Sequence, residues 1–294
     1  MAAPQTLKPA RTARPRPADR VVIAIDERRT TVLEALAAAR RRVGLSLFRC
    51  TDEAVFSALA RAVRRGVKVD AIVSLRSKGS KQDQRRLRDA LSRRGVTVHP
   101  YMDPVVKYHA KYLVVDDGPA IVTSLNFTKK CFSRTVDALV VTHDAAVVDG
   151  LWRLMRADWK GSALPDGLPA RLIVGPERAR KQIAALIGQA RRRLTLLDAK
   201  LTDPAMRRLL AARRRQGLEV RLMTDKQLHG LKAHGKILVI DNRLAMVGSI
   251  ALRTLSLESR REVALVVEDR AAVKALLSAL DGMAGAGGGR SGRG

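Results

Sequence analysis

The sequence has few aromatic residues, few cysteines and no long apolar run. Aromatic side chains make up 3% of the 294 residues, which argues against a single-strand nucleic-acid binder that stacks bases on aromatic platforms. The two cysteines, Cys50 and Cys131, form no CxxC pair and imply neither a disulfide framework nor a zinc site. The longest apolar stretches have the length of strands, as in VVIAI at residues 21–25, so no membrane span is predicted.

Acidic residues are also scarce relative to basic ones. There are 28 Asp and Glu against 56 Lys and Arg, which gives a net charge of +28. This charge favours a polyanionic partner, either nucleic acid or an anionic lipid surface. Residues 1–19 are basic and rich in proline and lack the apolar centre of a secretory signal, so we expect a disordered arm. Residues 284–294 are rich in glycine and are expected to be a flexible tail. A cytoplasmic location is the default, with peripheral contact to an anionic membrane left open.

The chain contains an internal repeat. Residues 41–74 resemble residues 191–224, and Asp52 and Asp203 stand at equivalent positions 151 residues apart (203 minus 52). In each copy a strand pattern leads to Thr-Asp, which favours a helix N-cap, and then to an amphipathic helix, a glycine and another strand. Residues 108–126 resemble residues 233–251 at an offset of 125 (233 minus 108), so the first copy carries about 26 extra residues (151 minus 125).

The repeat predicts an α/β protein of two similar halves, residues 20–160 and 171–283. The stretch GSALPDGLPA at 161–170 is rich in glycine and proline and is expected to be the linker. Strands that alternate with helices favour a mixed sheet flanked by helices in each half. We expect the halves to pack about a pseudo-twofold axis with the active site between them, in a chain that can act as a monomer.

Each half carries the pattern H-x-K, four residues, Asp, seven residues and Ser. A single histidine on a strand is more often structural, but two copies in register within a wider repeat indicate function. Histidine can act as nucleophile or exchange a proton near neutral pH. A lysine two residues later shares its face of a strand and supplies positive charge. The members of the two copies are His109, Lys111, Asp116 and Ser124, and His234, Lys236, Asp241 and Ser249.

Two kinds of acidic residue belong to this pattern. Asp116 and Asp241 open the turn signals DDGP and DN, so we interpret them as supports of turns. Asp137 follows His109 by 28 residues (137 minus 109), and Glu262 follows the second histidine by 28 (262 minus 234). A carboxylate can hold the second imidazole nitrogen and stabilise its cation. We therefore expect each of these two carboxylates to serve the histidine of its own half, with a solvated strand-edge position as the alternative.

The doubled motif resembles that of the phospholipase D superfamily, H-x-K-x4-D-x6-G-S-x-N. The resemblance covers both halves and implies a phosphodiesterase. One histidine would attack phosphorus to give a phosphohistidine, while the other would protonate the leaving oxygen and then activate water or an alcohol. No metal or other cofactor is implied. Hydrogen bonds to phosphate oxygens are expected from Ser124, Asn126 and Ser249.

Two positions depart from that family motif. Thr123 replaces the glycine before the first serine, and Ala251 replaces the asparagine of the second half. Because the first half keeps the fuller motif, we expect His109 to be the nucleophile and His234 the general acid and base.

The substrate is less well defined by the sequence. The run SLNFT resembles the compact nuclease branch of the family, but both motifs lie in one chain, as in phospholipases D and phosphatidyltransferases. We rank cleavage or transfer of a phospholipid first and a metal-independent nuclease acting on DNA or RNA second. A non-catalytic binder of nucleic acid or of an anionic membrane is the third alternative.

Overall fold

The structure is a computed structural model that describes residues 18–74, 81–101 and 103–285. The expected N-terminal arm and C-terminal tail therefore lie almost wholly outside the described residues. Within those residues, none of the helices has the length and apolar character needed to cross a membrane.

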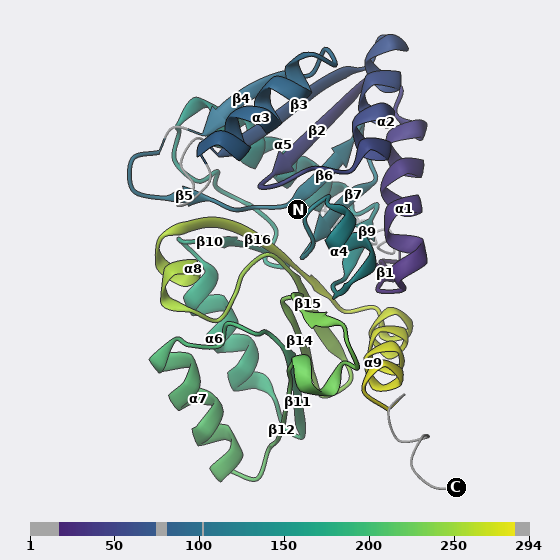
Figure 1. The fold of residues 1–294 in the computed structure, drawn as a ribbon. Coiled ribbons are helices and arrows are strands. Elements are labelled where there is room, and N and C mark those ends of the chain that lie inside the picture. Colours follow the sequence, from purple (N-terminus) through teal and green to yellow (C-terminus); the bar gives the residue numbers. More distant parts are fainter. Residues whose placement is uncertain (1–17, 75–80, 102, 286–294) are drawn as a thin grey trace, which may run out of the picture.

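The first half forms a seven-stranded mixed sheet in the order β1-β9-β7-β6-β2-β3-β4 (Figure 1). β2, β3 and β4 are parallel to one another, and the other neighbours are antiparallel. Its strands are β1 (Arg20–Val22), β2 (Arg42–Leu47), β3 (Lys68–Ser74), β4 (Thr97–Tyr101), β6 (Tyr112–Val115), β7 (Ala120–Thr123) and β9 (Leu139–Thr142). Its helices are α1 (Ile25–Ala38), α2 (Glu53–Arg64), α3 (Lys81–Ser92), α4 (Lys129–Ser133) and α5 (Ala145–Lys160).

The second half repeats this plan in the order β10-β16-β15-β14-β11-β12, with β11 and β12 parallel. Its strands are β10 (Leu172–Gly175), β11 (Arg193–Leu197), β12 (Glu219–Met223), β14 (Ile237–Ile240), β15 (Leu244–Gly248) and β16 (Arg260–Val267). Its helices are α6 (Ala179–Gln189), α7 (Pro204–Arg215), the short 3-10 helix η1 (Asp225–Gln227), α8 (Thr254–Glu258) and α9 (Arg270–Gly285).

The predicted N-caps and the extra segment of the first half are present. The Asp52 side chain accepts a hydrogen bond from the backbone of α2, and Asp203 does the same for α7, as capping aspartates do. The extra residues of the first half contain α3 and β4, and β4 adds an edge strand next to β3.

Successive side chains along each strand point to opposite faces of the sheet, and both faces are apolar. Leu113 of β6 packs in a cluster with α1, α2 and α3, whereas Val114 belongs to a cluster that contains α5. In β14, Leu238 packs with α6 and α7, while Val239 joins the same cluster as Val114. This shared cluster contains buried residues of both sheets, so the inner faces of the two halves form one core. The predicted α/β fold of two repeated halves is confirmed.

The halves also exchange short strands. β5 (Lys107–Tyr108) pairs in parallel with β16 of the second half, and β13 (Lys232–Ala233) pairs in parallel with β8 (Thr135–Val136) of the first. The two exchanges are equivalent under the 125-residue offset of the repeat. The predicted boundaries at 20–160, 161–170 and 171–283 stay a prediction, because strands cross between the halves.

Candidate active site

Both motif histidines lie where the chain passes from an exchanged strand into a sheet. His109 and Lys111 fall between β5 and β6, and His234 and Lys236 fall between β13 and β14. The expectation that the histidine and lysine of each pair lie on a strand is therefore wrong, because the chain leaves one sheet and joins another at this point. The lysine still lies on the histidine's side: Lys111 Nζ donates to the His109 carbonyl oxygen at 2.8 Å and lies 3.1 Å from His109 Nδ1.

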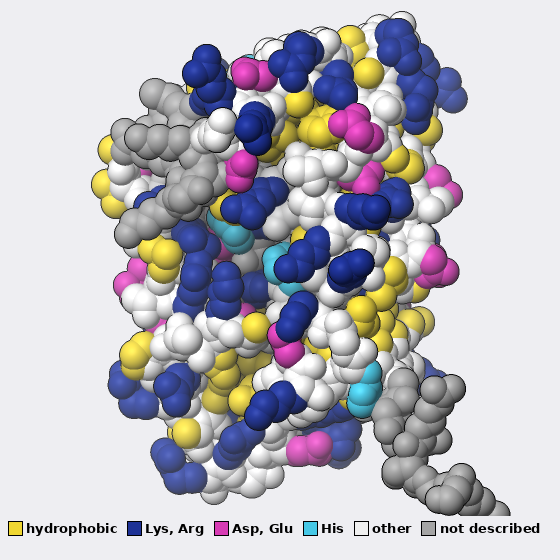
Figure 2. Space-filling view, viewed as in Figure 1, with side chains coloured by type: hydrophobic (Ala, Val, Ile, Leu, Met, Phe, Trp, Pro, Cys, Tyr) yellow, Lys and Arg dark blue, Asp and Glu magenta, His cyan; other side chains and the backbone are white. Residues whose placement is uncertain are grey.

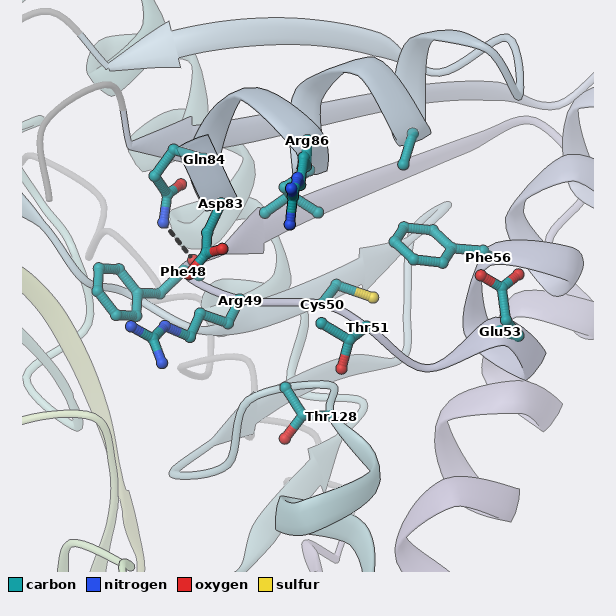
Figure 3. A pocket seen from close by; sticks show the side chains of 12 residues that line it. Phe48, Arg49, Cys50, Thr51, Glu53, Phe56, Asp83, Gln84, Arg86 and Thr128 are labelled. Atoms are coloured by element: carbon teal, nitrogen blue, oxygen red, sulfur yellow. Dashed lines mark hydrogen bonds between the residues drawn. The ribbon is translucent and has the colours of Figure 1, made fainter. Parts of the chain in front are cut away.

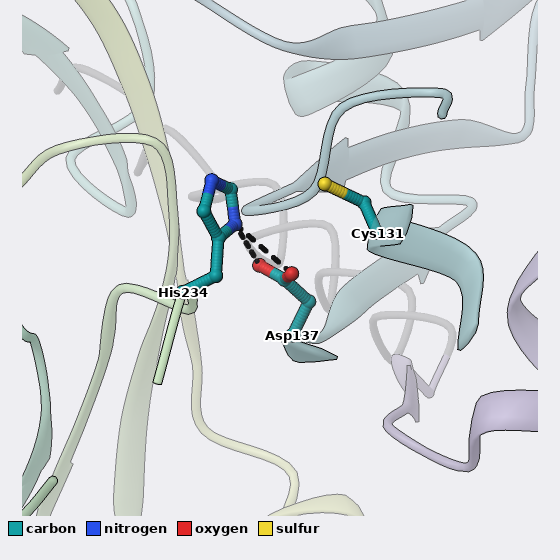
Figure 4. Close-up of side chains that lie close together, drawn as sticks. All are labelled: Cys131, Asp137 and His234. Atoms are coloured by element: carbon teal, nitrogen blue, oxygen red, sulfur yellow. Dashed lines mark hydrogen bonds and ion pairs between the residues drawn. The ribbon is translucent and has the colours of Figure 1, made fainter. Parts of the chain in front are cut away.

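Each histidine is held by a carboxylate from the other half. His109 Nδ1 lies 2.5 Å from Glu262 Oε1, and His234 Nδ1 lies 2.9 Å from Asp137 Oδ1 (Figure 4). Asp137 and Glu262 are thus imidazole partners, but the expected pairing within each half is wrong. Both Nδ1 atoms thus face a carboxylate, and His109 Nε2 lies 3.3 Å from Lys111 Nζ.

The exchanged strands explain this crossed pairing. Tyr108 pairs with Arg261, so the next residue of each strand brings a histidine of the first half beside a carboxylate of the second. Ala233 pairs with Val136, which does the same for the other pair. Since the two exchanges are related by the repeat, the site contains two histidine–carboxylate pairs of the same design.

The His234–Asp137 pair has an ionised carboxylate. The Asp137 side chain is fully buried and accepts hydrogen bonds of 2.6 Å from the hydroxyls of Ser124 and Thr135. Burial by itself would raise the pKa of Asp137, but the hydrogen bonds from His234, Ser124 and Thr135 lower it below its usual range. A stable carboxylate can fix the imidazole tautomer and stabilise its cation.

The His109–Glu262 pair is surrounded by cations. Burial raises the pKa of Glu262 to about 7, against the opposing attraction of Lys111 and Arg260. Burial, together with Lys111 and Arg260, holds the pKa of His109 well below its ordinary value. Burial also lowers the pKa of Lys111 to about 7. The His109 imidazole is therefore neutral near pH 7.

Both histidines line one cavity between the halves. In Figure 2, histidine side chains are visible among Lys and Arg side chains in the middle of the face shown. The cavity concentrates positive charge, which suits a phosphate group. Its lining residues are His109, Ser124, Lys200, His234, Lys236, Ser249, Ala251, Arg253, Ser256, Arg260 and Glu262.

Sequence reasoning missed three of these cations, Lys200, Arg253 and Arg260. The offset of 151 aligns Lys200 with Arg49, so a basic residue recurs after the first strand of each repeat. The offset of 125 aligns Arg253 with Thr128, and Arg260 with a second threonine. Comparison of the two copies beyond the motif, for charge present in only one, would have identified these arginines.

The predicted phosphate contacts of Ser124, Asn126 and Ser249 stay predictions. Ser124 and Ser249 line the cavity, whereas Asn126 is not among the described residues that do so. The Ser124 hydroxyl is directed to Asp137, and the Ser249 hydroxyl bonds to the backbone of Val263 at 3.2 Å. In this structure both serines thus support the strand that follows them.

Asp116 and Asp241 lie in turns outside this cavity. Each has a positive φ, 46° and 51° respectively. The carboxylate of Asp116 accepts hydrogen bonds from three consecutive backbone N–H groups, residues 40–42, and Asp241 accepts three from residues 191–193. These bonds tie the turn to the start of β2 or β11.

Phe48 connects His109 to a second cavity. The Phe48 ring packs against the His109 ring with centroids 4.4 Å apart, and it also lines a cavity between α2 and α3 (Figure 3). The helix α3 that walls this cavity belongs to the extra segment of the first half. Its lining is Phe48, Arg49, Cys50, Thr51, Glu53, Phe56, Asp83, Gln84, Arg86, Leu87, Ala90 and Thr128.

Comparison with known proteins agrees with this geometry. The family described as "Cardiolipin synthase, PLD-like domain" matches residues 32–159. Cardiolipin synthase A of Pseudomonas entomophila (strain L48) is 31% identical over 135 residues, which are 43% of this chain and 27% of that protein. The enzyme of the same name from Pseudomonas aeruginosa (strain LESB58) is 32% identical over 138 residues, 44% of this chain and 27% of that protein. The match thus spans about a quarter of the length of these relatives.

Two solved structures resemble the whole fold. Phosphatidylserine synthase of Haemophilus influenzae Rd KW20 has a TM-score of 0.71 at 12% identity, over 90% of this chain and 85% of that one. Polyphosphate kinase from Porphyromonas gingivalis has a TM-score of 0.72 at 20% identity, over 90% of this chain and 50% of that one. At these identities the likeness concerns the fold alone. Together with the doubled motif, the match of residues 32–159 to the PLD-like domain supports membership of the phospholipase D superfamily.

Proposed function

We propose that this chain is a phospholipase D-type phosphodiesterase that cleaves or transfers a phosphatidyl group through a phosphohistidine. The observation that supports it best is the crossed arrangement of the two histidine–carboxylate pairs. Each histidine comes from one half and its carboxylate from the other, and both imidazoles line one cationic cavity. In-line displacement at phosphorus needs a nucleophile on one side and a proton donor on the other.

The first step forms a bond between His109 Nε2 and phosphorus. The bond from phosphorus to the leaving oxygen breaks, its electron pair stays on that oxygen, and His234 as imidazolium donates a proton to it. In the second step His234 accepts a proton from water or an alcohol, whose oxygen attacks phosphorus. The P–N bond then breaks and its electrons return to His109, which restores the starting state.

The assignment of His109 as nucleophile rests on the charges around it. A nucleophilic imidazole must be neutral, and burial beside Lys111 and Arg260 lowers the pKa of His109. A general acid must carry a proton and form a stable cation, which the ionised Asp137 beside His234 favours. Lys236 and Arg253 line the same cavity and can stabilise charge on the phosphate oxygens.

A phospholipid is the substrate that we rank first. The relatives that match 43–44% of this chain are cardiolipin synthases. Phe48, whose ring packs on His109, also lines a cavity that includes the apolar side chains of Phe56 and Leu87. Such walls could receive the apolar part of a lipid whose phosphate lies at the histidines. The net charge of +28 also suits nucleic acid, so a metal-independent nuclease is the second candidate.

The test presents several phosphodiesters to the pure protein in EDTA. These are phosphatidylglycerol vesicles, single- and double-stranded DNA, RNA, and bis-nitrophenyl phosphate. We expect release or transfer of phosphatidyl groups, with a radiolabelled phosphatidyl group trapped by denaturation in alkali, in which the P–N bond is stable, on the peptide that contains His109. The control His143→Ala, which changes an exposed histidine, should retain both activities.

Three outcomes would count against parts of this proposal. No turnover of any substrate, or equal turnover by His109→Ala, would exclude the catalytic function. Cleavage of nucleic acid without any reaction of the vesicles would mean that the protein is a nuclease rather than a phospholipase. A label on the peptide that contains His234 would reverse the roles of the two histidines.

A further inference from the structure

The thiol of Cys131 lies beside the His234–Asp137 pair. Cys131 is in α4, and its sulfur, a carboxylate oxygen of Asp137 and a ring nitrogen of His234 all lie within 4.8 Å of one another (Figure 4). We propose that these three side chains form a binding site for a thiophilic divalent cation such as Zn²⁺, and that binding inhibits the enzyme. The inhibition rests on the proposed function, whereas the binding does not.

The three groups suit zinc in kind and in spacing. Zinc prefers thiolate sulfur, imidazole nitrogen and carboxylate oxygen, at about 2.0–2.3 Å. Atoms bound at these lengths to one tetrahedral ion lie about 3.3–3.7 Å apart. His234 Nδ1 and Asp137 Oδ1 are already 2.9 Å apart, and the thiol, within 4.8 Å of both ligand atoms, needs to approach by no more than roughly 1.5 Å. Water can take the fourth position.

The site belongs to only one of the two pairs. The 125-residue offset places Ser256 at the position equivalent to Cys131, and Ser256 forms a hydrogen bond with Glu262. A serine hydroxyl is a poor zinc ligand, and Lys111 and Arg260 next to Glu262 repel a cation. Asp137 needs no help from Cys131, because the hydroxyls of Ser124 and Thr135 already donate to it.

Metal binding would remove His234 from the proton transfers. The thiol releases its proton to solvent when its sulfur binds the ion. The hydrogen that His234 Nδ1 shares with Asp137 is replaced by the metal, and the neutral ring then carries its hydrogen on Nε2. That nitrogen has no lone pair with which to accept a proton from water or an alcohol, so the second step stops. The partly exposed His234 ring, which lines the catalytic cavity, provides the way in for the ion.

Cobalt provides a readout that does not depend on turnover. Co²⁺ bound to a thiolate shows a sulfur-to-metal charge-transfer band, and Zn²⁺ displaces Co²⁺ because both accept the same tetrahedral ligands. We expect this band at one ion per chain in the wild type and its loss in Cys131→Ser, the residue that the second half carries. The matched control is Cys50→Ser, which removes the other buried free cysteine and should keep the band.

Inhibition is measured as the ratio of rates with and without Zn²⁺ within each variant. Cys131→Ser should weaken inhibition by Zn²⁺ at least about tenfold, because removal even of a residue that only hydrogen-bonds to a metal ligand lowers metal affinity by that much. Cys50→Ser should leave the inhibition unchanged. Thermal unfolding of each variant checks its fold, and Cys131→Ala provides a second test of the thiol. Absence of the band, or a band lost with Cys50 and kept without Cys131, would overturn the site. A band that depends on Cys131, together with turnover insensitive to zinc, would overturn the inhibition alone.

Discussion

The two halves share one backbone plan but bring different charges to the cavity between them. Of the lining residues, the first half contributes His109 and Ser124, whereas the cations Lys200, Lys236, Arg253 and Arg260 come from the second. The exchange of strands then gives each histidine a carboxylate from the opposite half. As a result Glu262, with its raised pKa, stands among cations, and Asp137, with its lowered pKa, is held by neutral hydroxyls.

In the mechanism proposed above, this difference separates two chemical roles within a symmetric frame. The same histidine–carboxylate geometry surrounds His109 with cations and places His234 against an ionised carboxylate. The charge of the neighbours, more than the geometry, would then distinguish the proposed nucleophile from the proposed acid. Substitutions at equivalent positions in the two halves should therefore have unequal effects.

The largest expected effect is at the histidines. His109→Ala removes the proposed nucleophile and should lower kcat/KM at least about 10⁴-fold for every phosphodiester. His234→Ala should cost about 10²- to 10⁴-fold for a substrate with an alkoxide leaving group. Its cost should be much smaller for a nitrophenyl ester, because nitrophenolate leaves without a proton. Steady-state rates on the two kinds of substrate measure the difference. A leaving-group dependence in His109→Ala instead would exchange the two roles.

Substitutions of the two carboxylates should have the next largest effects on activity, and these effects should again differ between the halves. Asp137→Asn replaces an ionised partner and allows the wrong imidazole tautomer, so kcat should fall about 10³- to 10⁴-fold. Glu262→Gln should cost only about 10- to 100-fold, because a carboxyl with a pKa of about 7 is already partly protonated near neutral pH. Nitrogen NMR of the imidazoles tests the pairing: Asp137→Asn should shift the ring resonances of His234 and leave those of His109 in place. The opposite pattern would contradict the crossed arrangement.

That crossed arrangement marks where the sequence stops being informative. The repeat, the caps at Asp52 and Asp203 and the four motif residues of each half are local patterns, and they were predictable. Asp137 and Glu262 were found by their equal spacing of 28 residues. Spacing within a repeat cannot distinguish a partner in the same half from its equivalent in the other half, because both choices satisfy the same symmetry.

The cations show a second limit of the sequence. Arg253 and Arg260 are two among 56 basic residues, and no local pattern separates them from arginines on solvated helix faces. Their place in the cavity depends on how β16 and the segment before it pack against the first half, which is a long-range property. The same holds for the contact of Phe48 with His109.

The third prediction exchanges these cations for their first-half equivalents. Arg253→Thr and Arg260→Thr should each lower kcat/KM about 10- to 100-fold, because positive charge near the phosphate oxygens is lost in a partly buried site. Arg260→Thr should also change the pH dependence, since Arg260 Nη1 lies 3.7 Å from Glu262 Oε1. Arg208→Thr on α7, which is exposed, is the control and should retain wild-type rates. Equal losses in all three variants would mean that net charge matters rather than position.

The smallest effect on activity is expected where the halves are most alike. Asp116→Ala and Asp241→Ala each remove the acceptor for three backbone N–H groups at a turn outside the cavity. Each should lower the free energy of unfolding by about 1–2 kcal/mol, as loss of a capping aspartate does, and leave kcat within about twofold of the wild type.

The pH dependence of this loss follows from the two carboxyls. Burial opposes ionisation, but the backbone hydrogen bonds prevail and lower the folded-state pKa of both Asp116 and Asp241. A carboxyl with a lowered folded pKa contributes stability above its unfolded pKa and loses it as the pH falls through the folded value. The gap between wild type and either variant should therefore be full at pH 7 and narrow below about pH 4. Denaturant unfolding at several pH values measures it. Unequal losses of unfolding free energy in the two variants would show that the two turns are not equivalent. A loss of kcat without a loss of stability would instead give Asp116 or Asp241 a part in the chemistry.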